Sequence, residues 1–559
     1  MPNEVQTEFF INGISVPVTA NEEDVLKKAK DKMKRAGINP STLHFRLYKR
    51  SVDARRREDI RFVCTVLATS DKPISAFSKV KFKGADIKIA PKEELTAVIG
   101  KEPLLRRPLV VGMGPAGLFA AYILAKNGYA PILIDRGADV DTRARQVEKF
   151  KKEGVLDSES NVQFGAGGAG TFSDGKLVTR IHDARCNYVL ETLQQFGAPD
   201  EILVKAKPHV GTDILRVVVS NMLGEIERLG GSLYYNCRLE DFREESDGTV
   251  TVQTSKGSFS CGGLFLAIGH SARDTYLDLI KKNFAIEPKP FSVGVRIEHL
   301  QSDIDDALYG RFAGNPQLGP AEYTLSDTRG ERGVYTFCMC PGGEVMAAAS
   351  EHEGLVVNGM SYHARDQKNA NSAILASVGC EDIAPVNGNA ALGAIAFQRQ
   401  IERAAFHVGG KDYYAPMMTV GDFLENRHGT EYSRIVPSYR DGKVRPCRFD
   451  EIYPSFITKA LQYGIRSFGK KIVGFDAKDA VLTAAETRTS APLRILRNQQ
   501  TCTAVGHDRI FPCGEGAGYA GGITSAAVDG LRAALCFMER FAPIEDTDKE
   551  TVICERKQP

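Results

Sequence analysis

Three glycines near residue 112 have the spacing of a phosphate-binding turn. In the stretch RPLVVGMGPAG, Gly112, Gly114 and Gly117 follow a short apolar run and precede a helix-forming segment. In such a unit the first glycine permits a tight turn, and the second lets a pyrophosphate approach the backbone. The third lets the helix pack close to the strand. The helix start adds free N–H groups and positive dipole character. The expected chemistry is dinucleotide binding.

An acidic residue stands where such a site recognises ribose. Asp135 ends the next apolar strand, 131–134, and a carboxylate there accepts hydrogen bonds from both ribose hydroxyls. Its charge would repel a 2′-phosphate, which argues against NADP. The same glycine spacing recurs at 165–170 and 516–521, but only the first match has a strand, a helix, a second strand and an acid in order. A glycine-rich turn without a nucleotide is the alternative, and this context disfavours it.

Two later segments favour FAD over NAD. The apolar run 264–268 ends at Gly269, and the run 510–513 leads through Gly514 and Glu515 into a helix that we expect to end near residue 539. Glu515 could accept a hydrogen bond from a ribityl hydroxyl. The helix start would face the N1–C2=O edge of the flavin, where the reduced ring carries negative charge. An ordinary glycine-capped helix is the alternative. The sequence predicts one FAD held by two distant segments.

The substrate side offers fewer signals. Glu486 and Arg488 lie in the polar stretch 486–490, just before the last flavin segment. We predict that Arg488 clamps an anionic substrate group and that Glu486 positions it or handles a proton. The alternative is that the two side chains form a structural ion pair. His270 follows a strand at the flavin and could reach the cofactor, or it is a loop histidine without a role.

The cysteine pattern argues against thiol chemistry and metal binding. The chain has 12 cysteines with no CxxC or CxxxxC pair, so we do not expect a disulfide-reductase mechanism. Cys338 and Cys340 would share one face of a strand, but they lack partners at zinc spacing. We interpret them as small buried apolar residues. No metal site is expected, and the protein is predicted to be reduced and cytoplasmic.

These residues require an α/β architecture in several parts. We expect a Rossmann-like FAD-binding domain, an inserted α+β substrate domain, and a small N-terminal α/β domain of ferredoxin-like layout. Within the inserted domain, CPGGE between GVYTFCMC and EVMAAAS predicts a hairpin. The predicted boundaries are 1–95 for the N-terminal domain, 105–290 for the first part of the FAD domain, 291–500 for the insertion, and 501–545 for the rest of the FAD domain.

The overall charge is compatible with any small ligand and does not favour a polyanionic partner. Hydrophobic residues make up 43% and charged residues 25%, and the net charge is +2, so nothing draws the chain toward nucleic acid or an anionic membrane. No apolar run is long enough to cross a bilayer, and the first residues do not resemble a signal peptide. The basic stretch KRSVDARRRED at 49–59 could bind RNA, but its interleaved acids favour a solvated loop. A protein partner for residues 1–95 is left open.

Several motifs together resemble a known family. The stretches KRSVDAR at 49–55, NVQFGAGGAGTFSDGKL at 161–177, ETRTSAP at 486–492 and GEGAGYAGG at 514–522 are similar to those of FAD-dependent dehydrogenases of the glutathione-reductase-like superfamily. The resemblance covers nearly the whole chain and is strongest to a bacterial and plastid family of NAD(P)/FAD-dependent oxidoreductases. One departure is Asp135, since that position is often Glu in the superfamily.

The resemblance implies further flavin contacts. A loop after the first β-α-β unit would pack along the flavin, which places Gly167, Gly168, Thr171, Phe172, Ser173 and Lys176 there. Lys176 would either stabilise anionic reduced flavin or hold Asp174 at the surface. The complete expected FAD site adds the following residues: Pro115, Ala116, Arg136, Leu239, Ala267, Gly516, Gly522 and Ile523.

Three functional hypotheses follow. The first is an FAD-dependent oxidoreductase that transfers a hydride to or from a small organic substrate, with NADH or NADPH as a diffusible reductant because the sequence lacks a second complete nucleotide fingerprint. The second is a flavin-dependent RNA-modifying enzyme that uses the basic N-terminal module on tRNA. The third is a non-catalytic flavoprotein with a partner-binding N-terminal module.

Overall fold

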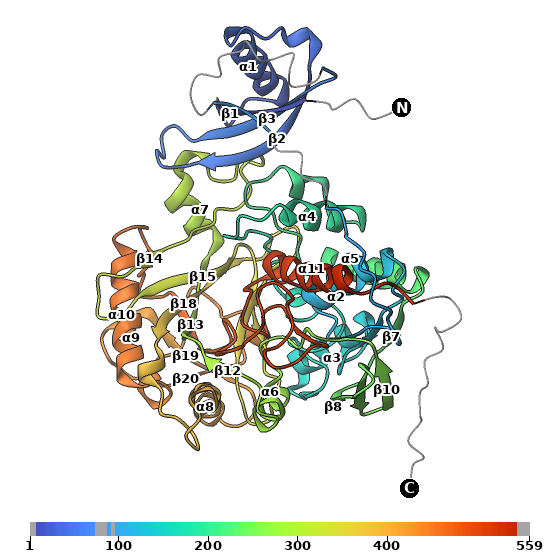
Figure 1. The fold of residues 1–559 in the computed structure, drawn as a ribbon. Helices are drawn as coiled ribbons and strands as arrows, with labels where there is room; N and C mark the ends of the chain where they lie inside the picture. The colour runs from blue at the N-terminus through green and yellow to red at the C-terminus, as the bar shows by residue number, and fades with distance from the viewer. Residues whose placement is uncertain (1–6, 73–85, 91–94, 545–559) are drawn as a thin grey trace.

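The computed structural model describes residues 7–72, 86–90 and 95–544, and it places a small N-terminal domain on a larger body (Figure 1). The antiparallel order β2-β3-β1-β4, with α1 between β1 and β2, is that of a ferredoxin-like sheet. Asn21 and Asp24 cap α1 reciprocally through a capping box. The elements are β1 (Thr7–Pro17), α1 (Glu22–Arg35), β2 (His44–Asp53), β3 (Arg61–Ser70) and β4 (Ile87–Ile89).

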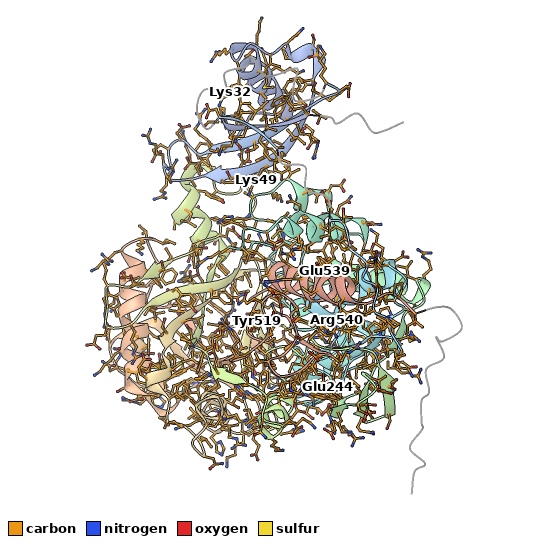
Figure 2. The ribbon with its side chains drawn as sticks, viewed as in Figure 1. Lys32, Lys49, Glu244, Tyr519, Glu539 and Arg540 are labelled. Carbon is orange, nitrogen blue, oxygen red and sulfur yellow. The ribbon has the colours of Figure 1, made fainter. Side chains whose placement is uncertain are left out.

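The N-terminal domain contacts the body through its basic side. The backbone of Arg50 pairs with that of Lys205, and Figure 2 places Lys49 on the side of this domain that faces the body. Arg57 donates to the Asp306 carbonyl at 2.6 Å, and Arg311 donates to the Glu58 carbonyl at 2.6 Å. The loop 55–59 is exposed, as predicted, and its Arg57 also contacts the body.

A five-stranded parallel sheet forms the centre of the nucleotide-binding part. Its order is β23-β11-β5-β6-β7, so the C-terminal strand β23 lies beside β11 although about 250 residues separate them. All but β7 are fully buried, as expected for a parallel sheet covered on both faces. The strands are β5 (Leu109–Val111), β6 (Ile132–Ile134), β7 (Ser232–Tyr234), β11 (Leu264–Leu266) and β23 (Ile510–Pro512).

The first and last helices of this part pack against each other. α2 (Pro115–Lys126) leads from β5 to β6, and α11 (Ile523–Arg540) follows β23 (Figure 1). A Cβ at Gly530 would lie 2.0 Å from the Ala116 carbonyl oxygen, so glycine permits this close approach. At the end of α11, Arg540 (Figure 2) pairs with Glu102 at 2.9 Å. The remaining elements are α3 (Val140–Glu153), α4 (Arg185–Gln195), α5 (Thr212–Arg228), β8 (Leu239–Glu244), β9 (Val250–Thr254), β10 (Gly257–Cys261) and α6 (Arg273–Lys281).

The insertion is built on a seven-stranded, mostly antiparallel sheet in the order β14-β15-β18-β13-β21-β19-β20. It carries a separate pair, β16 with β17, while β12 pairs with β22 beside the nucleotide-binding part. The strands are β12 (Ile286–Pro288), β13 (Phe291–Leu300), β14 (Ser326–Asp327), β15 (Val334–Cys340), β16 (Glu344–Ala347), β17 (Val357–Met360), β18 (Asn369–Val378), β19 (Ala415–Thr419), β20 (Val444–Pro446), β21 (Val481–Glu486) and β22 (Leu493–Ile495). The helices are α7 (Gln301–Tyr309), α8 (Ala390–Val408), α9 (Val420–Leu424) and α10 (Ser455–Gly469).

The predicted CPGGE hairpin is wrong. β15 pairs with β14 and β18, whereas β16 pairs with β17. The turn does reverse the chain, and a Cβ at Gly342 would lie 1.8 Å from the Arg365 carbonyl oxygen. The ten residues of β18 give β15 a longer partner than the short β16, so tertiary pairing overrides the local turn signal. In the described part of the chain, no helix is both long and apolar enough to cross a membrane.

Candidate active site

One pocket joins the nucleotide-binding sheet to the insertion. Its volume is about 310 Å³, at the lower end of the range for small-molecule sites. It lies at the carboxyl ends of β5, β6, β11 and β23 and reaches residues of β15, β17 and β21. The sequence-predicted residues that line it are Gly112, Gly114, Pro115, Ala116, Asp135, Arg136, Gly168, Ser173, Lys176, Leu239, Ala267, Gly269, Glu486, Arg488, Glu515, Gly522 and Ile523.

Six predicted residues lie behind this lining and shape it. A Cβ at Gly117 would be 1.8 Å from the Gly112 carbonyl oxygen, and one at Gly516 would be 2.5 Å from the Gly269 carbonyl oxygen. These glycines let neighbouring turns pack closely. Phe172 is buried beneath the Arg143 guanidinium at 4.8 Å. The six residues are Gly117, Gly167, Thr171, Phe172, Gly514 and Gly516.

Other glycines open space that a cofactor would fill. A Cβ at Gly269, Gly521 or Gly522 would meet no described atom within 4 Å, and one at Gly114 would meet only the Gly168 Cα, at 3.7 Å. α2 begins after Gly114 and α11 begins after Gly522, and neither helix start has a side-chain cap among the described residues. Uncapped N–H groups at two glycine-lined helix starts suit a diphosphate and an anionic ring edge. The residues present therefore fit FAD.

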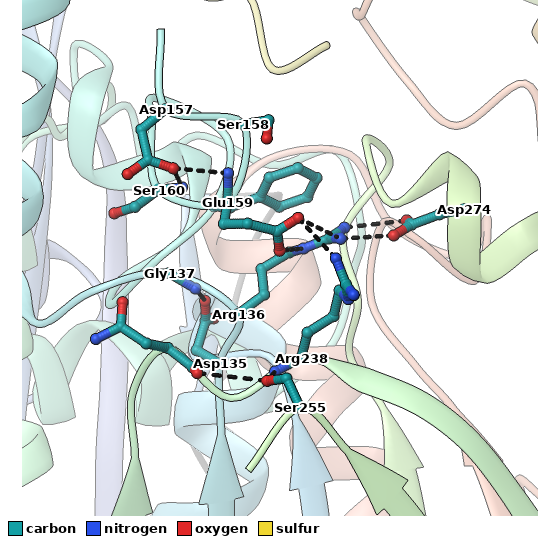
Figure 3. Close-up of polar contacts among 12 residues, drawn as sticks. Asp135, Arg136, Gly137, Asp157, Ser158, Glu159, Ser160, Arg238, Ser255 and Asp274 are labelled. Atoms are coloured by element: carbon teal, nitrogen blue, oxygen red, sulfur yellow. Dashed lines mark hydrogen bonds and ion pairs between the residues drawn. The ribbon is translucent and has the colours of Figure 1, made fainter. Parts of the chain in front are cut away.

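The ribose end of the pocket is held by charge pairs (Figure 3). Asp135 accepts hydrogen bonds from the Met113 amide at 2.8 Å and the Gly137 amide at 2.9 Å. Burial raises the pKa of Asp135, although these amides oppose the shift. Next to it, Arg136 pairs with Glu159 at 2.9 Å and Asp274 at 2.5 Å. The two amides thus fix the Asp135 carboxylate just beyond the end of β6.

Lys176 brings a positive charge to the pocket wall. Its Nζ lies 2.8 Å from Asp174 Oδ2 and 3.6 Å from Glu322 Oε2. Burial opposes the charge on Lys176, but the two acids outweigh it and raise its pKa. Asp174 is fully buried and also accepts two bonds from Arg365, at 3.0 and 2.5 Å. The alternative in which Lys176 holds Asp174 at the surface is therefore wrong.

Glu486 and Arg488 both line the pocket but do not pair with each other. Arg296 of β13 donates to the two Glu486 oxygens at 2.6 and 2.9 Å. Arg488 instead donates to Glu402 of α8 at 3.2 and 3.0 Å, and to Ser350. The predicted structural pair is wrong because the neighbouring strand and α8 supply better-placed partners. The two charges are thus anchored separately at one wall of the pocket.

Two further titratable groups face the pocket. Burial raises the pKa of Glu515 to about 7, with only a small opposing effect from the Gly522 amide and Lys289. Burial, together with Arg488 and Arg273, lowers the pKa of His270 to about 3. His270 Nδ1 lies 3.0 Å from Ser271 Oγ. At neutral pH, His270 is an uncharged hydrogen-bonding group and not an acid.

Sequence reasoning missed a group of lining residues contributed by distant elements. Cys338 was interpreted as a buried apolar residue, but it is partly exposed and lines the pocket, while Cys340 is buried. Phe337, Cys338, Asn358 and Thr489 come from the insertion, and only its packing brings them to the pocket. Gln163 and Gly521 lie in the motif stretches 161–177 and 514–522, which could have identified them. The missed residues include Gln163, Val178, Arg238, Ser271, Phe337, Cys338, Asn358, Thr489 and Gly521.

Comparisons with known proteins give relatives for most of the chain. Residues 290–489 match the family model described as "FAD-dependent protein, C-terminal domain-like", and residues 10–69 match a domain of unknown function. A Clostridium beijerinckii protein, described as an uncharacterized protein, is 45% identical over 535 residues. The match covers 95% of this chain and 98% of that protein.

Solved structures show more distant likeness. The halogenase PltM aligns over 78% of this chain and 68% of its own, with 12% identity and a TM-score of 0.35. CtdE in complex with FAD aligns over 78% and 84%, with 10% identity and a TM-score of 0.30. The tetracycline destructase Tet(51) aligns over 78% and 82%, with 12% identity and a TM-score of 0.30.

Proposed function

The chain belongs to the FAD-dependent oxidoreductase family, and we propose that it transfers a hydride between FAD and a small organic substrate. FAD is its cofactor, and the protein is an FAD-dependent enzyme. The observation that supports hydride transfer to a separate substrate is the composition of the pocket. One wall is a glycine-lined nucleotide cradle, and the other carries Lys176, Glu486 and Arg488 from other parts of the fold.

Each group of residues has a distinct task in this proposal. Bound FAD supplies two-electron redox chemistry. Gly112 and Gly114 leave the backbone open to the diphosphate, and Asp135 orients the ribose. The start of α11 and the ammonium of Lys176 place positive potential at the pocket, which favours the anionic reduced state of a flavin.

The substrate would be held at the wall contributed by the insertion. Arg488 keeps one free N–H on each terminal nitrogen after its bonds to Glu402 and Ser350, which is enough to orient an anionic group. Glu486 is bound to Arg296, so its first task is to position the substrate. His270, uncharged at neutral pH, can donate or accept a hydrogen bond there.

We further propose that NADH or NADPH enters the same pocket as a diffusible reductant, because the sequence has only one complete nucleotide fingerprint. The test is to add each nucleotide to the yellow holoenzyme without oxygen and follow flavin absorbance. One of them should reduce the flavin, seen as loss of its absorbance, at a rate within the usual range of enzyme turnover, about 1–1000 s⁻¹. If neither does so, the nicotinamide-linked reductase assignment is wrong.

The other two hypotheses have less support. For RNA modification the basic stretch would need free arginines, but Arg55 pairs with Asp53 at 2.6 Å and Arg57 is bound to the Asp306 carbonyl. Weak RNA binding with little salt dependence is therefore expected. A non-catalytic role predicts a flavin that dithionite does not reduce and air does not reoxidise. We expect both steps to occur.

A further inference from the structure

Two cysteines meet at the wall of the cofactor pocket. Cys338 and Cys340 belong to β15, and both are free thiols in the structure. Cys338 lines the pocket with part of its surface exposed, whereas Cys340 is fully buried directly behind it. The same pocket holds the glycine cradle for FAD. The accessible Cys338 thiol therefore has the buried Cys340 thiol two residues away in the same strand.

The backbone at this point departs from a regular strand. Between Phe337 and Cys340, β15 has one residue more than the facing segment of β18, which is a β-bulge. Cys338 has a φ of 42°, in the left-handed region that residues other than glycine rarely adopt. Strained backbone conformations of this kind are concentrated at functional sites.

The bulge brings the Cys340 thiol against the backbone of Cys338. In an extended strand, residues two apart lie about 6.6 Å apart, near the upper limit for a disulfide. Here the Cys340 thiol folds back and donates to the Cys338 carbonyl oxygen at 3.2 Å. The Cys340 thiol therefore lies next to residue 338 within one short segment, instead of a full two-residue strand spacing away from it.

Positive charges favour a thiolate at Cys338. The neighbouring Cys340, then Arg296 and Lys176, lower the pKa of Cys338 against the opposing effect of burial. Arg296 Nη1 lies 2.8 Å from the Cys338 carbonyl oxygen and 4.0 Å from Cys340 Sγ. By contrast, burial raises the pKa of Cys261 to about 12. These charges therefore favour the thiolate form of Cys338, as at reactive thiols.

We propose that Cys338 and Cys340 form a redox-active dithiol pair that exchanges two electrons with the FAD of this pocket and reduces a small disulfide compound. This inference rests on the proposed function, whose substrate class it specifies. The sequence argued against such chemistry only because CxC lacks the usual CxxC or CxxxxC spacing.

The atoms and electrons balance in two stages. The Cys338 thiolate attacks one sulfur of the substrate disulfide and displaces the other as a thiolate, which takes up a proton. Cys340 then loses its proton and attacks the mixed disulfide at Cys338, which releases the second thiol and leaves a Cys338–Cys340 disulfide. Two electrons and one proton, delivered as a hydride by NADH or NADPH and passed on through the flavin, would restore the Cys338 thiolate and the Cys340 thiol.

The first test is mass spectrometry of the yellow holoenzyme after oxidation with diamide. The tryptic peptide 333–365 contains Cys338 and Cys340 and no other cysteine. We expect this peptide to lose two hydrogens and to resist alkylation until dithiothreitol is added. Alkylation of both cysteines after oxidation would overturn the inference, and this measurement requires no variant.

The second test counts electrons in an anaerobic dithionite titration of the oxidised holoenzyme. We expect four electrons per FAD in the natural protein, two for the flavin and two for the disulfide, and two electrons in Cys338→Ser and Cys340→Ser. Cys447→Ser is the matched control, since Cys447 is a buried thiol outside the pocket, and it should still take up four.

The outcomes separate this inference from the proposed function. Yellow protein that takes up only two electrons in its natural form refutes the dithiol pair and leaves the FAD-dependent reaction intact. Colourless protein refutes both. If a serine variant fails to fold, the peptide mass and electron count of the natural protein still decide the matter.

Discussion

Replacing Gly114 with valine isolates cofactor binding from folding. Gly114 has φ −75° and ψ −178°, which is extended backbone that any residue adopts. An added Cβ would meet only the Gly168 Cα, at 3.7 Å. The substitution therefore neither strains the backbone nor clashes, and we expect the free energy of unfolding of the apoprotein to change by less than about 1 kcal/mol.

The effect on FAD should be large. A valine side chain at the start of α2 would fill the space over the helix N–H groups that receive the diphosphate. Losing two charge-assisted hydrogen bonds, at about 1.5–3 kcal/mol each, gives about 3–6 kcal/mol. Since about 1.4 kcal/mol corresponds to a tenfold change, the Kd for FAD should rise by about 100-fold to 10,000-fold.

The assay is titration of apoprotein with FAD, followed by quenching of flavin fluorescence, together with thermal melting. Gly224→Ala is the control, because a Cβ at this position in α5 meets no described atom within 4 Å and lies outside the pocket. It should retain FAD. Gly117→Val should instead prevent folding, since its Cβ would lie 1.8 Å from the Gly112 carbonyl oxygen. A folded Gly114→Val protein that binds FAD within threefold of the natural affinity would refute the assignment.

Three further substitutions test the electrostatics of the site. Glu515→Gln should stabilise the apoprotein at pH 8 but not at pH 4. Burial raises the pKa of Glu515 from 4.5 to about 7, so the contribution of Glu515 to stability is lost as the pH rises through that window. The loss should be less than about 3 kcal/mol, because the side chain borders the pocket. Equal melting shifts at both pH values would contradict this. Lys176→Met should lower the flavin reduction potential by about 30 mV or more, because the substitution removes a cation from the pocket wall. An unchanged or higher potential in a dye-coupled titration would show that Lys176 acts only on Asp174. Glu402→Gln should reduce the free energy of unfolding by about 3–5 kcal/mol, because Glu402 accepts bonds from the two buried arginines Arg273 and Arg488. A loss below about 1 kcal/mol in urea unfolding would contradict this role of Glu402.

The nucleotide-binding unit could be predicted from sequence because its signals are local. A strand, a glycine turn, a helix and an acid occur within 30 residues, and the structure places β5, α2, β6 and Asp135 in that order. The same holds for the final segment, where β23 and α11 correspond to the predicted strand and helix. The parallel pairing of β23 with the rest of the sheet through β11 follows from the general layout of such sheets.

The substrate wall depended on tertiary structure. Glu486 and Arg488 are two residues apart, and a pair between them was one of the two alternatives, but Arg296 and Glu402 approach them from elements more than 80 residues away in the chain. Likewise, nothing near Cys338 in the sequence shows that a bulge forms at this residue, or that Arg296 and Lys176 lie close enough to lower its pKa. Glycine turns and helix starts act through their own backbone, so the sequence alone determines them. Ion pairs and perturbed thiols depend on which distant charges packing brings within a few ångströms, and only the folded chain decides that.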